Sequence, residues 1–296
     1  MINLHVDVDN LWVYEKEFDI RINKDQEQIY SQALPVLLNL LNKSQSKATF
    51  MIVGKDLKLK ACQVFCRKAI AEGHEIANHS FDHPISFGTM SYEQKKQQIF
   101  KTHQRIAEVC GIKPVGFRGP GYYQDKEIIT ILQKLNYQYD ASVIPGFAQI
   151  LMSMYAYIKG GENRHKTFGR LNYILDQEHP HIVKGLNPNN KLLELPISVL
   201  PILRLPMHTT FAYFLGSWYR KLILNYLKSK PKYMLYLFHA IDFVDLPMHV
   251  NNHPIIPLRY SFNERINFLE DVLDILVQSN GRGLQTSRSI FKAIHH

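Results

Sequence analysis

The sequence predicts an α/β fold, a distorted (β/α) barrel of about seven parallel strands with inserted amphipathic helices. Short apolar segments alternate with helical segments along the first half of the chain, which is typical of parallel strands covered by helices. Polar residues follow several of these segments, as expected where the carboxyl ends of barrel strands meet. The chain has 296 residues and is 46% apolar, enough for one large core. We therefore expect one catalytic domain over residues 1–296, with inserted segments at about 146–190 and 200–230.

Each expected element follows from its residue pattern. Residues 2–8 alternate between apolar and polar side chains, so Asp7 and Asp9 are expected on one face of a strand. Gly73 and Gly111 are expected to end two helices, because glycine favours the left-handed conformation that closes a helix. The other expected strands are residues 48–53, 75–78, 115–117, 137–142, 192–197 and 233–238. The expected helices are residues 31–43, 55–72, 92–109, 125–135 and 263–277, followed by a short final helix.

Composition narrows the class of partner. The formal net charge of +9 and the pI of about 9.3 favour an anionic partner, which could be a phosphate, an acidic lipid surface or a nucleic acid. The sequence shows no known nucleic-acid-binding motif, so we expect no nucleic-acid partner. Three cysteines argue against a disulfide framework. We find neither a signal-peptide pattern after Met1 nor an apolar run of about 18 residues that would span a membrane.

Two histidines form the first candidate site. His79 and His83 lie four residues apart after the strand expected at 75–78, and we expect both on the same side of a helical turn. Their imidazoles could bind one divalent metal ion, with Asp7 or Asp9 as a third ligand. The other carboxylate would then be available as a base. The alternatives are a chance histidine spacing and aspartates that cap a turn or pair with a lysine.

Two further strand ends carry candidate catalytic groups. Arg118 precedes Gly-Pro-Gly, where a guanidinium could hold a carboxylate and backbone N–H groups could bind an oxyanion. His239 ends a strongly apolar segment and suits a general acid, with Asp140, or else Asp242, as the carboxylate that orients it. The alternatives are an ordinary Gly-Pro turn beside a surface arginine, and a histidine bonded to a backbone carbonyl at the edge of the core.

The complete set of motifs resembles the polysaccharide deacetylase (NodB-homology, carbohydrate esterase) family over about residues 2–245. The motifs are Asp7-Val8-Asp9, His79-Ser80-x-x-His83, Arg118-Gly-Pro-Gly-Tyr122, Asp140-Ala-Ser142 with Pro145, and Leu237-Phe-His239. The resemblance implies a distorted (β/α) barrel and a divalent metal ion, often zinc.

The resemblance also implies a role for each motif residue. By position, Asp9, His79 and His83 correspond to the metal ligands, and Asp7 to the catalytic base. The remaining roles are Arg118 orienting the base, Tyr122 binding the oxyanion through its backbone N–H, and His239 as the acid with Asp140 as its partner.

The chain departs from the common family pattern at three places. Many members have adjacent aspartates, whereas this chain has Asp-x-Asp, and glycines flank the proline of the third motif. The last motif, His239-Ala-Ile-Asp242, is similar to that of deformylases acting on undecaprenyl-phosphate-linked amino-arabinose.

Two apolar stretches favour a lipid-borne substrate. In each stretch the apolar side chains are expected on one face at helical spacing, and basic residues crowd the end of the second stretch. The first set is Phe147, Ile150, Leu151, Met154, Tyr155 and Ile158, and the second is Phe211, Phe214, Leu215, Trp218, Tyr219, Leu222 and Tyr226. The basic residues are Arg220, Lys221, Lys228, Lys230 and Lys232. The alternative is that both helices are amphipathic because they pack on the barrel.

The leading hypothesis is a metal-dependent hydrolase that removes an acetyl or formyl group from an amino sugar carried on a polyprenyl phosphate. We expect it in the cytoplasm, peripheral on the cytoplasmic face of the inner membrane. The same fold could instead act on a soluble glycan or a cyclic imide. A non-catalytic barrel that binds glycan or lipid is the alternative from another class. The sequence does not indicate an oligomeric state.

Overall fold

The computed structural model describes residues 1–22, 25–84, 86–147, 171–183, 191–246 and 253–295. Its fold is α/β, as predicted, with eight strands in one sheet rather than about seven. The strands are β1 (Ile2–Val8), β2 (Thr49–Ile52), β3 (Glu75–Asn78), β4 (Gly116–Phe117), β5 (Tyr139–Asp140), β6 (His181–Val183), β7 (Leu192–Glu194) and β8 (Met234–His239). The α-helices are α1 (Leu11–Phe18), α2 (Leu34–Lys43), α3 (Lys60–Ala71), α4 (Tyr92–Cys110), α5 (Lys126–Lys134), α7 (Thr209–Leu215), α8 (Ser217–Lys228), α9 (Phe262–Asn280) and α10 (Ser287–His295).

The sheet has the order β6-β7-β5-β4-β3-β2-β1-β8. The pairings of β1 with β8, β3 with β4, β4 with β5 and β5 with β7 are parallel. The additional strand is β6, which pairs antiparallel with β7. Its three residues lie inside the segment expected to be an insertion, where no strand was predicted.

The described residues form two compact units, which we treat separately. The first contains Met1–Phe50, Asp56–Ile76 and Met207–Ser287, and the second contains Met51–Lys55, Ala77–Pro206 and Arg288–His296. The prediction of one domain over residues 1–296 stays a prediction.

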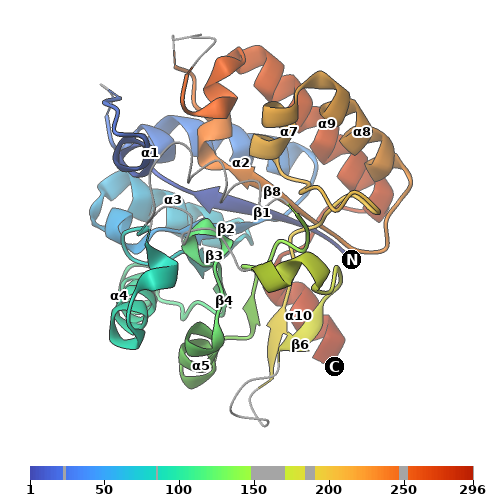
Figure 1. Cartoon of the computed structure of the whole chain (residues 1–296). Coiled ribbons are helices and arrows are strands. Elements are labelled where there is room, and N and C mark those ends of the chain that lie inside the picture. The colour runs from blue at the N-terminus through green and yellow to red at the C-terminus, as the bar shows by residue number, and fades with distance from the viewer. Residues whose placement is uncertain (23–24, 85, 148–170, 184–190, 247–252, 296) are drawn as a thin grey trace. The chain divides into compact units, whose positions relative to one another are not determined.

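The first unit is built around β1 and β8, which lie side by side in Figure 1. Every residue of both strands is buried. β8 is apolar on both faces, whereas one face of β1 carries Asn3 and His5, which hydrogen-bond to Ser287. Helices α8 and α9 pack on each other in the same unit. A capping box of Ser261 and Glu264 starts α9, and Gly281 ends it in the left-handed conformation.

Arg265 on α9 holds the turn that follows β8. Its side chain is 1% exposed, and its guanidinium donates to the carbonyls of Ile241, Asp242 and Val244 at 3.1, 2.8 and 2.8 Å. A buried guanidinium that bonds several carbonyls fixes their backbone, because breaking these bonds would leave buried polar groups unsatisfied. The turn after His239 therefore has a defined conformation.

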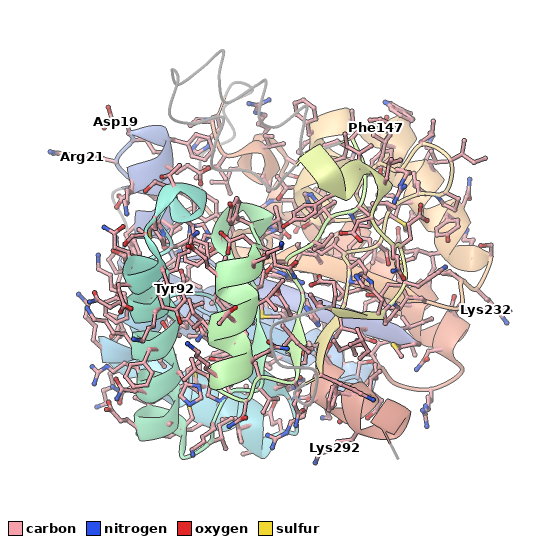
Figure 2. All side chains as sticks on the ribbon, turned by 60° about the horizontal axis from the view of Figure 1, so that its bottom comes forward. Asp19, Arg21, Tyr92, Phe147, Lys232 and Lys292 are labelled. Carbon is pink, nitrogen blue, oxygen red and sulfur yellow. The ribbon has the colours of Figure 1, made fainter. Side chains whose placement is uncertain are left out.

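In the second unit, α4 and α5 lie side by side over an apolar cluster (Figure 1). Figure 2 shows the two helices from another side, with Tyr92 labelled at the start of α4. A Ser91–Gln94 capping box starts α4, and Gly111 ends it, as predicted. The cluster includes Phe87, Ile99, Phe117, Ile128, Leu132 and Tyr137.

The segment expected as one apolar helical face at 211–226 is two helices with two different faces. Gly216, at a φ of 83°, separates α7 from α8. Phe211 and Tyr219 are buried, whereas Phe214 and Trp218 are 51% and 55% exposed. The prediction that all these side chains share one face is therefore wrong. The first apolar stretch, residues 147–158, lies outside the described residues apart from Phe147.

Candidate active site and metal centre

Asp7 and His239 face each other at the ends of neighbouring parallel strands. Asp7 lies opposite His239 in the register of β1 and β8, and its carboxylate Oδ2 is 3.9 Å from His239 Nε2. The two side chains are nearly buried, with Asp7 2% and His239 8% exposed. Asp9 follows one residue after the end of β1. The sequence thus places a potential base beside a potential acid, because parallel strands present their carboxyl ends at one edge.

The surroundings of His239 include residues to which the sequence analysis gave no role. Thr210 Oγ1 lies 3.3 Å from His239 Nδ1, and the ring of His208 lies 5.9 Å from the His239 ring. Both residues come from the segment that joins the edge of β8 through a parallel bridge between His208 and Leu237. A sequence pattern gives no signal for this bridge, because its partners are far apart along the chain.

Asp242, the second candidate for orienting His239, contacts the backbone of His239. Its Oδ2 accepts from the His239 backbone N–H at 2.9 Å and also from Thr209 Oγ1. Burial raises the pKa of Asp242, against the effect of the neighbouring His239 charge. The pairing of Asp140 with the His239 ring stays a prediction.

The segment from His79 to His83 is a loop and not the predicted helical turn. Ser80 and His83 both have positive φ, 63° and 42°, which excludes a helix. The two rings nevertheless meet, with centroids 5.0 Å apart. His79 Nδ1 lies 2.8 Å from the Arg118 carbonyl oxygen, so Nδ1 carries the proton and Nε2 is the nitrogen available as a ligand.

Asp9, His79 and His83 could hold a metal ion. Asp9 and His79 are buried, and the His79 and His83 rings lie together within the second unit. Two imidazole nitrogens and one carboxylate oxygen form a ligand set known from catalytic zinc sites, which keep a further position open. The fixed tautomer of His79 adds the kind of outer hydrogen bond that orients metal-binding histidines. The residues present therefore fit a divalent transition metal.

Arg118 is completely buried, which excludes the alternative of a surface arginine. Its Nε donates to the Ala141 carbonyl at 2.8 Å, and its charge acts on Asp140. Asp140 is buried too and accepts from Ser142 and Gln124 at 2.5 and 2.6 Å. Burial raises the pKa of Asp140 to about 6, although these hydrogen bonds and the Arg118 charge act in the opposite direction.

The loop after Arg118 has an unusual backbone. Gly121 and Tyr122 are both in the left-handed region, with φ of 61° and 58°. A Cβ at Gly119 would lie 2.2 Å from the Tyr123 carbonyl oxygen, so only glycine fits there. The Tyr122 N–H donates to the Gly119 carbonyl at 3.0 Å in this conformation. The role of Tyr122 as an oxyanion donor stays a prediction.

Gln124 and Glu194, which no sequence motif singled out, are buried beside Asp140. Gln124 Nε2 donates to Asp140 Oδ2 and to Glu194 Oε2, both at 2.6 Å. Glu194 is fully buried on β7, and burial followed by the Asp140 charge raises its pKa well above the usual value. A single acidic residue inside the apolar run Leu192-Leu-Glu-Leu195 was the available signal, because strand interiors rarely bury a lone acid.

Comparisons with known proteins agree with this fold and with the family that the motifs resemble. A sequence model of the family described as polysaccharide deacetylase matches residues 20–139. The uncharacterised protein YlxY of Bacillus subtilis is 32% identical over 101 residues, which is 34% of this chain and 31% of that protein. The peptidoglycan-N-acetylglucosamine deacetylase PgdA of Listeria monocytogenes is 29% identical over 98 residues, 33% of this chain and 20% of that protein. The chain spans less than a third of the length of either relative.

Two solved structures share the fold over nearly the whole chain. A structure described as a putative polysaccharide deacetylase from Mycobacterium smegmatis has a TM-score of 0.62 at 16% identity, covering 99% of this chain and 89% of that one. The allantoinase PuuE has a TM-score of 0.62 at 12% identity, with the same coverage. These two likenesses show a shared α/β fold. The match of the polysaccharide deacetylase model over residues 20–139 agrees with the resemblance that the motifs carry.

Proposed function

We propose that this chain is a metal-dependent hydrolase that removes an acetyl or formyl group from the nitrogen of an amino sugar. The observation that carries the proposal is the pair of Asp7 and His239 at the ends of β1 and β8, 3.9 Å apart. Amide hydrolysis needs a base for the attacking water and an acid for the leaving amine, and such a pair supplies both. The name of the Listeria relative, a deacetylase of N-acetylglucosamine in peptidoglycan, supports the class of substrate.

The chain's own residues account for the proton transfers. Asp7 removes a proton from water as the water oxygen bonds to the acyl carbon, and His239 gives a proton to the nitrogen as the carbon–nitrogen bond breaks. Asp9, His79 and His83 would hold the metal ion. When bound, a divalent ion such as Zn²⁺ polarises the acyl carbonyl and makes water more acidic. The products are acetate or formate and the free amino sugar.

The direct test is release of acid and amine from N-acetyl and N-formyl amino sugars by the purified protein. We expect equal amounts of the two products, loss of activity after chelation, and recovery when Zn²⁺ or Co²⁺ is added back. N-acyl sugars on polyprenyl phosphate, soluble glycans and cyclic imides should be compared in the same assay. Absence of product from every N-acyl substrate would contradict the proposal and favour the non-catalytic binding barrel.

We further propose that the sugar is carried on a polyprenyl phosphate and that the outward face of α7 and α8 rests on an anionic lipid surface. Phe214 on α7 and Trp218 and Leu222 on α8 are exposed, and Lys221 is exposed beside Leu222. Residues 209–232 contain five basic residues and no acidic one. Figure 2 shows Lys232 at the outer edge with its side chain pointing away from the ribbon. Aromatic and basic side chains together suit the headgroup region of a bilayer.

Among the described helices, none combines the length and the apolar character that a membrane span requires. The contact that we propose is a peripheral one, made by the exposed side chains of α7 and α8. Placement on the cytoplasmic face of the inner membrane is part of the same proposal.

Vesicle binding checks the lipid contact. We expect the protein to sediment with vesicles containing phosphatidylglycerol, and Trp218→Ala or Lys221→Glu to weaken this binding about 5- to 10-fold, since a charge near an anionic surface contributes about 1 kcal/mol. Raised salt should release the protein. Phe100→Ala and Lys96→Glu change exposed residues on α4 and serve as matched controls. Equal binding by all four variants, or equal binding to neutral vesicles, would refute the contact.

A further inference from the structure

The two oxygens of Asp140 hold both ends of the loop that follows Arg118. At the start of the loop, the Gly119 N–H donates to Ser142 Oγ at 2.8 Å, and Ser142 Oγ donates to Asp140 Oδ1 at 2.5 Å. At its end, Gln124 Nε2 donates to Asp140 Oδ2 at 2.6 Å. The Asp140 carboxylate therefore fixes the distance between the two ends of this loop. The loop backbone itself contains two consecutive residues in the left-handed region, Gly121 and Tyr122.

Glu194 fixes the amide that makes the second of these contacts. It lies opposite Asp140 in the parallel register of β5 and β7, and its Oε2 accepts from Gln124 Nε2 at 2.6 Å. Its other oxygen accepts from the Val143 backbone N–H at 3.0 Å. Both N–H bonds of the Gln124 amide are thus directed to carboxylates, and Gln124 cannot turn away from Asp140 without breaking a buried bond to Glu194.

The backbone of Gln124 is held as firmly as its side chain. Tyr173, which is 3% exposed, bonds through its hydroxyl to both the N–H and the carbonyl of Gln124, at 3.1 and 2.5 Å. Burying an acid such as Glu194 is costly unless hydrogen bonds compensate for the loss of water. The hydrogen bonds that compensate for burying Glu194 also fix the Gln124 amide, and this amide in turn fixes the end of the loop.

We propose that Glu194 is a positioning residue for the reaction, acting through Gln124 to fix Asp140 and the loop of residues 119–123. The inference rests on the proposed N-deacylation, because its kinetic effect requires that Arg118 and this loop serve the reacting groups. Glu194 itself contacts Gln124 and Val143 and is not assigned a contact with substrate.

The kinetic test is a double-mutant cycle. We expect Glu194→Ala and Gln124→Ala each to lower kcat about 10- to 100-fold, the usual loss for a residue that orients a catalytic group, with KM changed less than about threefold. The double variant should be no slower than either single variant, because Glu194 acts only through Gln124. Glu194→Gln, which keeps one acceptor oxygen, should recover part of the rate. Glu178→Ala, which removes a partly exposed partner of Arg204, is the matched control. An unchanged kcat in Glu194→Ala, or losses that multiply in the double variant, would overturn the inference.

Amide hydrogen exchange tests the same inference without activity. In Glu194→Ala we expect the Gly119 and Gln124 amides to exchange about tenfold faster, while amides of the β1–β8 ladder keep their wild-type rates. If the wild type hydrolyses no N-acyl sugar, the proposed function fails but this measurement still decides the role of Glu194. Unchanged exchange at both amides would overturn the positioning role even in an active enzyme.

Discussion

Replacing Asp7 with asparagine is expected to lower kcat about 10³-fold while leaving metal binding intact, because removing a general base costs 10²- to 10⁴-fold. Asparagine has nearly the same size as aspartate, but its neutral amide cannot act as a base near pH 7. The Asp7 carboxylate is almost fully buried and lies 3.9 Å from His239 Nε2, so the substitution removes a base that faces the proposed acid. The measurement is steady-state release of acetate or formate, with metal content determined on the same samples.

The control for this prediction is Asp271→Asn, a change of an exposed aspartate on α9 that should alter neither quantity. Asp9→Asn gives the opposite pattern to Asp7→Asn, with loss of metal and of activity together. If instead Asp7→Asn loses the metal and Asp9→Asn keeps it, the roles of base and ligand are reversed. Full activity in Asp7→Asn would eliminate Asp7 as the base.

The elements that the sequence predicts well are those whose signals are local. β1 alternates between apolar and polar side chains, β8 is a nearly continuous apolar run, and each ends at or beside a polar residue that a core would not accept. Helices α4 and α9 have a serine with Gln or Glu three residues later at the start and glycine at the end, so their bounds agree closely with expectation. Because β1 and β8 are parallel neighbours, Asp7 and His239 at their carboxyl ends lie at the same edge of the sheet.

What the sequence does not predict depends on backbone conformation or on distant partners. The spacing of His79 and His83 is the same in a helical turn and in a loop, and only the positive φ of Ser80 and His83 distinguishes them. Gly216 divides one apolar pattern into two helices with different exposed faces. Glu194 gains its significance from Gln124, which lies 70 residues away along the chain. No window of sequence contains that contact.

His79→Ala is expected to remove bound metal and to abolish activity. Purified wild-type protein should contain about one equivalent of a divalent transition metal, as a three-ligand catalytic site implies. Losing one of three protein ligands removes most of the binding, and the Arg118 carbonyl that orients the His79 ring cannot substitute for it. The measurement is elemental analysis of wild type and variant, before and after dialysis against Zn²⁺.

His181→Ala is the matched control, because His181 is a partly exposed histidine on β6 whose ring contacts the His179 carbonyl. His83→Ala should behave as His79→Ala does, since both rings belong to the same set of ligands. If His79→Ala keeps a full equivalent of metal, the ion is held elsewhere and the site of Asp9, His79 and His83 is refuted. If the wild-type protein binds no metal even when metal is supplied, the proposed metal-dependent hydrolysis is refuted. The predicted change in amide hydrogen exchange at Gly119 and Gln124 in Glu194→Ala does not depend on this result.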